Sequence, residues 1–250
     1  MAETTFRTLI TAFTDFLTVA IHTILWERSI YPKTSFLSAR KYNFPVKQNR
    51  HPKVCEWIND AVTAVESELL KGRVHSVGVV IFTKDSKPLE RFVFDVSRFP
   101  DVPVDDLDTL LQSGDADEPH SILPVVEMEE QFRATLSKLT ASRTSLGPAP
   151  EGCTFTVAIE LKPDALAPVS HPQPWIPAQV ADDENDGATA RHPTAKTTPL
   201  RAIKAGEMKF EAWIEEAGSD AADGVGLQWQ WFPLFDEDTT MSSSHASRNS

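Results

Sequence analysis

The period of the hydrophobic pattern changes within the first hundred residues, and this change limits the folds that the chain can adopt. Apolar residues recur at helical spacing from Thr8 to Trp26, and again from His51-Pro52 to the Lys71-Gly72 pair, which suits a helix end. The next segments, Val74–Thr83 and Leu89–Val96, instead alternate or are rich in β-branched residues. The pattern therefore predicts two helices followed by a β-hairpin.

The rest of the chain adds a third helix and further strands. The helix is predicted over Ile122–Leu139, and strands are predicted over Cys153–Leu161, Met208–Glu215 and Val225–Phe235. Nine of the 18 prolines lie between Pro148 and Pro199, and we expect residues 178–198 to be mobile. This order of elements favours an α+β fold, with helices on one face of a largely antiparallel sheet.

The first predicted helix is apolar enough to be considered as a membrane span. However, Asp15 and His22 lie inside it, and Glu3 precedes it where a signal peptide carries positive charge. The apolar spacing is that of a buried or amphipathic helix in a globular protein. We therefore expect a core helix and no membrane partner.

Acidic residues are concentrated in short segments, and this distribution bears on nucleic-acid binding. The formal net charge is −12, from 36 acidic and 24 basic side chains. Half of the acids lie in four segments without Lys or Arg, namely 101–120, 182–186, 215–223 and 236–238. We expect these acidic segments to be flexible, on a mildly basic scaffold. The overall excess of acid argues against strong direct DNA binding by the isolated chain.

One stretch, residues 28–53, contains seven bases interleaved with aromatic residues and no acid. It is the best candidate for contact with a nucleic acid. The alternative is a solvated loop with short strands, which covers the core and packs its aromatic side chains beneath it. No RNA- or DNA-binding signature accompanies the stretch, so we favour the covering loop.

The chain carries no recognisable catalytic, cofactor-binding or metal-binding motif. It lacks the HExxH, CxxC, GxSxG, Walker and GxGxxG patterns, and its seven histidines show no ligand spacing. Cys55 and Cys153 are too few for a disulfide framework or a four-cysteine zinc site, which favours a reduced intracellular compartment. The expected class is a binding or scaffold protein without catalytic residues, cofactor or metal.

Two tryptophans are the most informative side chains. Trp57 lies on the apolar face of the second predicted helix, and Trp175 stands among prolines in the segment 171–177. Each is consistent with packing, Trp57 in the core and Trp175 as the anchor of a loop. Tryptophan is also favoured at binding hot spots, so the residues alone leave both interpretations open.

Six short segments, in this order and at suitable spacing, resemble a known family. They are Leu25–Pro32, Lys41–Val46, His51-Pro52, Arg91–Asp95, Pro150–Val157 and Pro174–Ile176. Together they resemble the HORMA-domain family, and specifically its mitotic-arrest-deficient-like branch, which serves as the non-catalytic subunit of translesion DNA polymerase zeta. The resemblance covers roughly residues 6–100 and 121–216.

The resemblance implies a single HORMA domain over residues 1–235, with three helices packed on a mainly antiparallel sheet. A mobile C-terminal segment, the safety belt, wraps a short extended partner peptide in this family and pins it against the sheet. The implied parts are a core 6–162, an acidic insertion 101–120, a safety belt 163–235 and a disordered tail 236–250. The segment 225–235 lies beyond the family pattern, and it is either an added edge strand or an internal segment that occupies a partner site.

The family's binding surfaces imply roles for matching positions of this chain. The residues implied to contact a peptide of the polymerase catalytic subunit are Trp57 and Trp175. A second surface binds the translesion deoxycytidyl transferase, and its matching positions are Thr197, Glu211 and Trp213. A third surface, on the third helix, supports HORMA–HORMA homodimerisation, and its matching position is Arg133.

The implied function is that of a nuclear adaptor in translesion synthesis and DNA repair, with an AAA+ remodelling ATPase as a further candidate partner. Two alternatives stay open. A spindle-checkpoint or meiotic chromosome-axis adaptor would have the same fold, although the segments Pro150–Val157 and Arg40–Val46 favour the translesion branch. An enzyme of unrecognised type belongs to a different class, and the lack of catalytic motifs argues against it.

Overall fold

The computed structural model describes residues 5–111, 125–166, 168, 175–177, 196–217 and 229–231 of the 250-residue chain. The helices are α1 (Phe6–Glu27), α2 (Pro52–Leu70) and α3 (Val125–Leu146), with short 3-10 turns η1 (Lys33–Ser35) and η2 (Val104–Asp106). The strands are β1 (Phe36–Lys41), β2 (Phe44–Asn49), β3 (Val74–Phe82), β4 (Pro88–Asp95), β5 (Thr154–Leu161), β6 (Ile176–Pro177), β7 (Lys196–Ala205), β8 (Met208–Glu216) and β9 (Trp229–Trp231).

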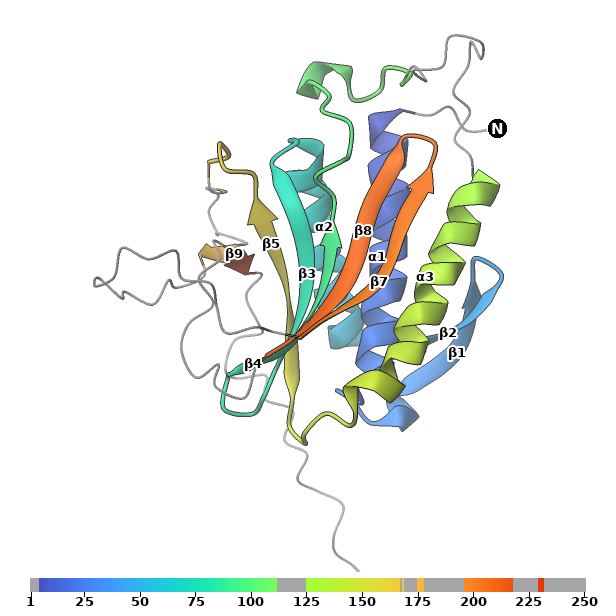
Figure 1. The fold of residues 1–250 in the computed structure, drawn as a ribbon, viewed down its shortest axis with the longest axis vertical. Helices are drawn as coiled ribbons and strands as arrows, with labels where there is room; N and C mark the ends of the chain where they lie inside the picture. The colour runs from blue at the N-terminus through green and yellow to red at the C-terminus, as the bar shows by residue number, and fades with distance from the viewer. Residues whose placement is uncertain are drawn as a thin grey trace, which may run out of the picture.

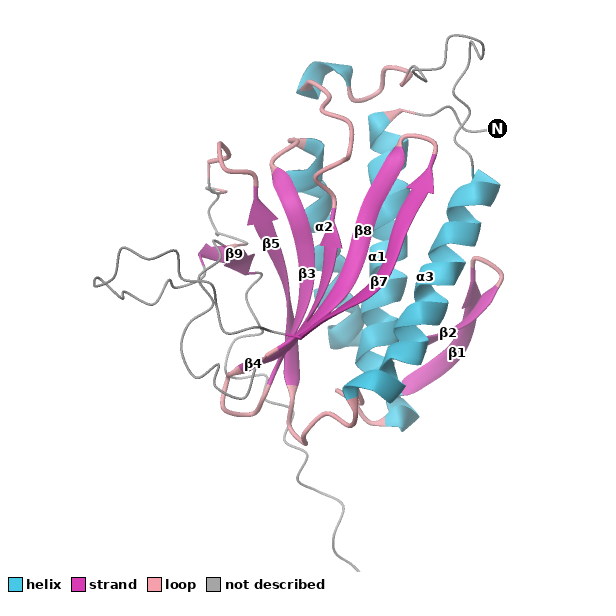
Figure 2. Ribbon diagram, in the orientation of Figure 1, coloured by secondary structure: helices cyan, strands magenta, loops and turns pink. Residues whose placement is uncertain are grey.

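Seven strands form one sheet in the order β6-β9-β5-β3-β4-β8-β7, and all of these neighbours are antiparallel. Strands β1 and β2 form a separate hairpin. The three helices share one hydrophobic core with the sheet. Figures 1 and 2 show α1 and α2 behind the sheet, with α3 beside β7. The described residues therefore confirm the predicted α+β architecture.

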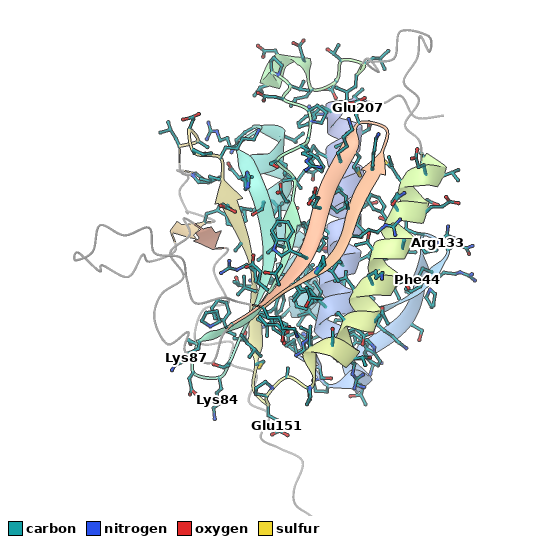
Figure 3. All side chains as sticks on the ribbon, in the orientation of Figure 1. Phe44, Lys84, Lys87, Arg133, Glu151 and Glu207 are labelled. Atoms are coloured by element: carbon teal, nitrogen blue, oxygen red, sulfur yellow. The ribbon has the colours of Figure 1, made fainter. Side chains whose placement is uncertain are left out.

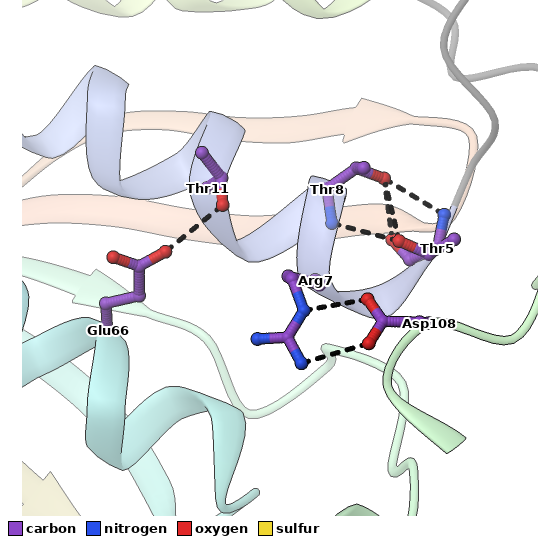
Figure 4. Close-up of polar contacts among 6 residues, drawn as sticks. All are labelled: Thr5, Arg7, Thr8, Thr11, Glu66 and Asp108. Atoms are coloured by element: carbon purple, nitrogen blue, oxygen red, sulfur yellow. Dashed lines mark hydrogen bonds and ion pairs between the residues drawn. The ribbon is translucent and has the colours of Figure 1, made fainter. Parts of the chain in front are cut away.

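Helix α1 begins at a capping box and is largely buried. The Thr5 hydroxyl accepts a hydrogen bond from the backbone N–H of Thr8, and the Thr8 hydroxyl accepts one from the backbone N–H of Thr5 (Figure 4). This reciprocal arrangement stabilises the first turn. By length and composition α1 could cross a membrane, but 67% of its most apolar window is buried inside the fold. It packs as the core helix that its spacing predicts.

Aromatic rings connect α1 to the sheet and to α3. Phe16 stacks on Phe132 of α3, with ring centroids 4.6 Å apart, and meets Phe94 of β4 edge-on at 5.9 Å. Phe13 meets Phe210 of β8 edge-on at 5.2 Å. Such pairs contribute about 0.5–1.5 kcal/mol beyond the burial of their area, so they fix the position of α1 between α3 and the sheet.

Residues 36–49 form a regular hairpin, more ordered than the loop with short strands that the sequence predicted. Strands β1 and β2 pair from Phe36–Asn49 to Lys41–Phe44. The two turn residues, Tyr42 and Asn43, have φ angles of +53° and +55°. A type I′ turn requires positive φ at both positions, and its usual sequence signal is Asn-Gly. Tyr-Asn does not carry that signal, which is why the sequence did not define the hairpin.

The hairpin covers the end of α1, in keeping with the favoured interpretation of the basic stretch. Phe44 is partly buried against the core. The ammonium groups of Lys33 and Lys47 lie 5.2 and 4.9 Å from the centroid of the Trp26 ring. Cations over an aromatic face are stabilising, so these two bases of the stretch have structural contacts of their own.

The structure differs from the sequence prediction at α3 and β7. Helix α3 continues past the predicted end at Leu139 to Leu146, and the buried Ser142 hydroxyl donates a hydrogen bond to the Leu139 carbonyl at 2.6 Å. This bond satisfies a polar side chain inside the helix.

Strand β7 was not predicted, because Pro199 is unfavourable in a strand interior. Pro199 lies beside a register shift of the β7–β8 pair, and proline is tolerated at such irregularities.

The acidic insertion packs against α1 over its described part, residues 101–111. Arg7 donates two hydrogen bonds to the Asp108 carboxylate, at 2.7 and 3.1 Å (Figure 4). Its backbone N–H donates to the carbonyl of Leu107. Leu107 is buried, and Leu110 bridges to Thr5. The prediction of a flexible segment is therefore wrong for residues 101–111, where leucines between the acids dock on the core. The other predicted mobile or disordered segments lie wholly or mainly outside the described residues.

His22 is a buried residue of α1, and desolvation lowers its pKa from 6.5 to about 4. Its Nδ1 accepts a hydrogen bond from the backbone N–H of Asn49 at 3.4 Å, which the neutral ring can do. Because the folded-state pKa is depressed, the unfolded chain binds a proton first, and stability falls as the pH decreases from 6.5 towards about 4. The expected loss is about 3 kcal/mol.

Urea unfolding at about pH 7 and about pH 4 measures this loss. His22→Gln keeps a hydrogen-bond acceptor but cannot titrate in this range. The variant is therefore expected to show a smaller decrease in the free energy of unfolding between the two pH values. An equal decrease in the parent and the variant would assign the pH dependence to other groups.

Candidate peptide-binding edge of the sheet

One edge of the sheet is built from short strands that come from distant parts of the chain. Strand β9 pairs with three residues of β5, Ala158, Ile159 and Glu160. On its other side it pairs with both residues of β6, Ile176 and Pro177. The opposite side of β5 pairs with β3 along its full length. Strand β5 thus presents an edge that accepts a short extended segment, and β6 flanks that segment as the next strand.

Trp57 lies on α2, behind this edge. Its side chain is 5% exposed, and its ring meets that of Phe155 in β5 edge-on, with centroids 4.9 Å apart. Tyr31 also meets the Phe155 ring edge-on, at 6.3 Å, and burial raises the pKa of its hydroxyl. An aromatic layer therefore supports β5 from the helical side.

Trp175 directly precedes β6 and has an exposed fraction of 0%. It is one of the largest fully buried side chains of the described residues, and it belongs to the main core. The segment that leads into β6 is thus anchored to the core by this side chain. Both tryptophans have a packing role, and their contact with a partner peptide stays a prediction.

Two parts of this edge were not found from the sequence. Strand β6 has only two residues, so it has no periodicity that could reveal it. The contact between Trp57 and Phe155 joins a helix to a strand almost a hundred residues later. A signal for it did exist, since Phe155 and Val157 are two positions apart and therefore lie on the same face of the strand.

Thr197, Glu211 and Trp213 lie together on the face of the sheet opposite the helices. Every second residue of β8 belongs to the core that faces the helices. Glu211 and Trp213 lie at the positions between these residues, so they occupy the other face of the sheet. Thr197 of β7 pairs with Glu215, two positions from Trp213. The Trp213 Nε1–H donates to Glu215 Oε1 at 2.8 Å, and Glu211 forms an ion pair with Arg98 at 2.9 Å. The structure brings these three residues onto one surface, and binding there stays a prediction.

Arg133 lies on α3, at the side of the domain (Figure 3). Its side chain is 37% exposed, and its guanidinium nitrogen is 3.8 Å from Glu130. Such an exposed pair contributes less than about 1 kcal/mol, so the fold does not depend on Arg133.

Arg133→Ala is expected to shift any homodimer towards monomer in light scattering while the melting temperature stays nearly unchanged. Arg143→Ala, exposed on the same helix, is the control, and an unchanged dimer would remove Arg133 from the interface.

Comparisons with known proteins identify the family and its relatives. The family model described as HORMA domain matches residues 10–207. The DNA polymerase zeta processivity subunit of Schizosaccharomyces pombe is 34% identical over 205 residues, which cover 82% of this chain and 91% of the relative. The mitotic spindle assembly checkpoint protein MAD2B of Danio rerio is 32% identical over 207 residues, which cover 81% and 88%.

Solved structures share the same fold at lower identity. A chain in the crystal structure of the mitotic checkpoint complex has a TM-score of 0.59 and 20% identity, covering 84% of this chain and 98% of that chain. HTP-2 of C. elegans bound to the HIM-3 closure motif has a TM-score of 0.52 and 12% identity, covering 82% and 88%. The family model spans most of the chain, and the helices, the antiparallel sheet and the relatives agree with it. This chain is a member of the HORMA-domain family.

Proposed function

We propose that this HORMA-domain protein is a non-catalytic adaptor subunit of DNA polymerase zeta, which supports translesion synthesis and DNA repair. The observation that carries the proposal is the 34% identity to the S. pombe protein named as the DNA polymerase zeta processivity subunit, over 91% of that protein's length. In this proposal the safety belt clamps a peptide of the polymerase catalytic subunit at the β5 edge.

The β5 edge suits this role for physical reasons. An extended peptide that adds to a sheet edge gains main-chain hydrogen bonds, while pockets for its alternate side chains supply specificity. Trp57 supports β5 from behind, and Trp175 anchors the segment that leads into β6. Prolines around Trp175 restrict the free conformations of the belt, which reduces the entropy lost when it closes.

The proposal extends to further partners. The surface defined by Thr197, Glu211 and Trp213 would bind the translesion deoxycytidyl transferase, and Arg133 would contribute to a HORMA homodimer. An AAA+ remodelling ATPase would open the belt, and the protein would act in the nucleus. The acidic excess of the chain predicts weak DNA binding by the isolated subunit, so contact with DNA would come through the polymerase.

A second candidate function is that of a spindle-checkpoint or meiotic chromosome-axis adaptor. It is favoured by the 32% identity to the Danio rerio relative, which is named as a mitotic spindle assembly checkpoint protein. A clamp of the same geometry would serve either role, so the bound peptide decides between them.

The test is co-purification of the tagged full chain, followed by mass spectrometry of the peptide that stays bound after limited proteolysis. We expect the catalytic subunit of DNA polymerase zeta, represented by one short extended segment. Arg133→Ala should retain this partner, because Arg133 lies on α3 and away from the β5 edge. Recovery of checkpoint or chromosome-axis proteins without any polymerase subunit would favour the second function and overturn the first.

A further inference from the structure

Strand β9 belongs to the chain's own C-terminal part, yet it lies between β5 and β6, where the proposed partner peptide would bind. We infer that Trp229–Trp231 is an intramolecular occupant of the peptide site, and that an incoming peptide must displace it. This inference rests on the proposed use of the β5 edge as the peptide site. It does not depend on which protein supplies the peptide.

The pairing leaves no room for a second segment in the same place. Neighbouring strands of a sheet lie about 4.7–4.9 Å apart, so the position between β5 and β6 is one strand wide. Strand β6 pairs with β9, and β9 in turn pairs with Ala158–Glu160 of β5. A peptide that pairs with Ala158–Glu160 and lies under β6 therefore competes directly with β9.

The occupant is short enough to be displaced. It pairs with β5 over three residues, whereas β3 pairs with eight residues of β5. A hydrogen bond contributes only about 0.5–1.5 kcal/mol net, and three paired residues therefore form a weak contact. The covalent connection to β8 favours the binding of β9 in spite of this weak contact, because a short linker holds a segment at an effective concentration in the millimolar range. Such an occupant lowers the apparent affinity of a partner peptide without preventing its binding.

The sequence of the segment suits a strand that adds to an edge. Residues 225–235 contain no charged side chain, and Trp229 and Trp231 belong to a residue type enriched in strands. The acids at 236–238 begin immediately afterwards. This stretch extended beyond the family pattern in the sequence, and a cis occupant of the peptide site gives it a role.

The first test uses variants of the full chain and a fluorescein-labelled peptide of residues 225–235 that carries a solubilising lysine pair. Gln230→Pro removes a backbone N–H from a strand that has neighbours on both sides, and therefore disfavours β9. Gln230→Thr keeps the N–H and is the matched control. We expect the labelled peptide to bind Gln230→Pro at least about tenfold more tightly than the parent or Gln230→Thr.

Hydrogen exchange in the absence of peptide provides a second readout. The amides of Ala158–Glu160 should exchange faster in Gln230→Pro than in Gln230→Thr, while those of β3 stay protected. Equal peptide affinity for the three proteins, together with equal exchange at Ala158–Glu160, would overturn the inference.

A disulfide lock tests the same pairing without proline. Ala158 and Trp231 are register partners, and facing Cα atoms of antiparallel strands are close enough for a disulfide. Ala158→Cys/Trp231→Cys, in a Cys55→Ser/Cys153→Ser background, should cross-link within one chain under mild oxidation. The oxidised form should lose peptide binding, and a reductant should restore it. Failure to cross-link, cross-linking only between chains, or peptide binding by the oxidised form would each contradict the inference.

These outcomes separate the inference from the proposed function. If the 225–235 peptide binds Gln230→Pro but no polymerase peptide binds, the cis occupant stands and the polymerase partner fails. If a polymerase peptide binds the parent and both Gln230 variants with one affinity and one association rate, the clamp stands and the cis occupant fails.

Discussion

Replacing Trp175 with alanine is expected to release β6 from the core and to weaken the retention of a bound peptide by about a hundredfold or more. Trp175 is 0% exposed, and truncation of a buried tryptophan costs about 3–5 kcal/mol. The helices and the strands β3, β4, β5 and β8 are held by other contacts, such as the Phe16–Phe132 stack. The cost should therefore fall on the docking of the belt and leave most of the fold in place.

Trp57→Ala should behave differently, although it removes the same kind of side chain. Trp57 lies on α2 and contacts Phe155 of β5, so its loss creates a cavity in the central core. We expect a lower melting temperature together with weaker peptide binding. Trp26→Ala is the control, because Trp26 contacts Phe36 and two lysines of the hairpin region and lies outside the β5 edge.

The measurement is a thermal melt and a peptide dissociation rate for each variant, side by side. Fast dissociation with a nearly parental melt is the expected result for Trp175→Ala, and the melt distinguishes it from Trp57→Ala. Trp26→Ala should keep the parental dissociation rate. If Trp57→Ala and Trp175→Ala both fold normally and hold the peptide as the parent does, the clamp assignment is wrong.

The elements that could be predicted are those whose secondary structure is indicated by residues close together in the sequence. Helix α2 begins at Pro52, where a missing N–H costs nothing, and ends before Gly72, which has a φ of +68° as a left-handed cap requires. The β3–β4 hairpin follows from alternation and a turn sequence. In these segments the residues that set the local conformation also bury the correct face.

The two strands that escaped prediction did so for different reasons. Strand β7 contains Pro199 and pairs with β8, whereas β6 has two residues, which pair with β9 among the described parts of the chain. In β7 the proline interrupts the pattern of a strand that otherwise pairs with its neighbour in sequence, and β6 is too short to show a period and pairs with a segment more than fifty residues later. The β5 edge is assembled from these strands, so the sequence could name Trp57 and Trp175 without showing how they are arranged.

Arg28 illustrates the same limit for charge. In the sequence it is one of seven bases in the stretch 28–53 that was the best candidate for nucleic-acid contact. In the structure it is 3% exposed and forms an ion pair with Glu90 of β4, with Nη2 and Oε1 2.5 Å apart. Its Nη1 donates to the carbonyl of Gly147 at 2.7 Å, just after α3. Arg28 therefore joins the end of α1 to the sheet and to the end of α3.

Breaking this buried pair from one side is expected to be strongly destabilising. Arg28→Met leaves the Glu90 carboxylate in the interior without its partner, and such a loss typically costs about 3–5 kcal/mol. Arg28→Met/Glu90→Leu removes both charges and should be more stable than Arg28→Met alone. Arg7→Met is the matched control, because Arg7 forms a pair of similar length with Asp108 on the surface, where solvent screens the charges, and its loss should destabilise the fold far less.

The pH dependence of Arg28→Met tests the physical cause. Burial already raises the pKa of Glu90 above its usual 4.5, and Arg28 offsets part of that increase. Without Arg28 the folded-state pKa should rise further. A group whose pKa is raised by folding stabilises the folded state below its unfolded pKa and loses that contribution as the pH rises. The destabilisation of Arg28→Met, measured by urea unfolding, should therefore shrink as the pH falls towards 4.5. A deficit that is constant with pH and equal in the double variant would mean that Arg28 acts through its packing and its bond to Gly147, and not through the charge of Glu90.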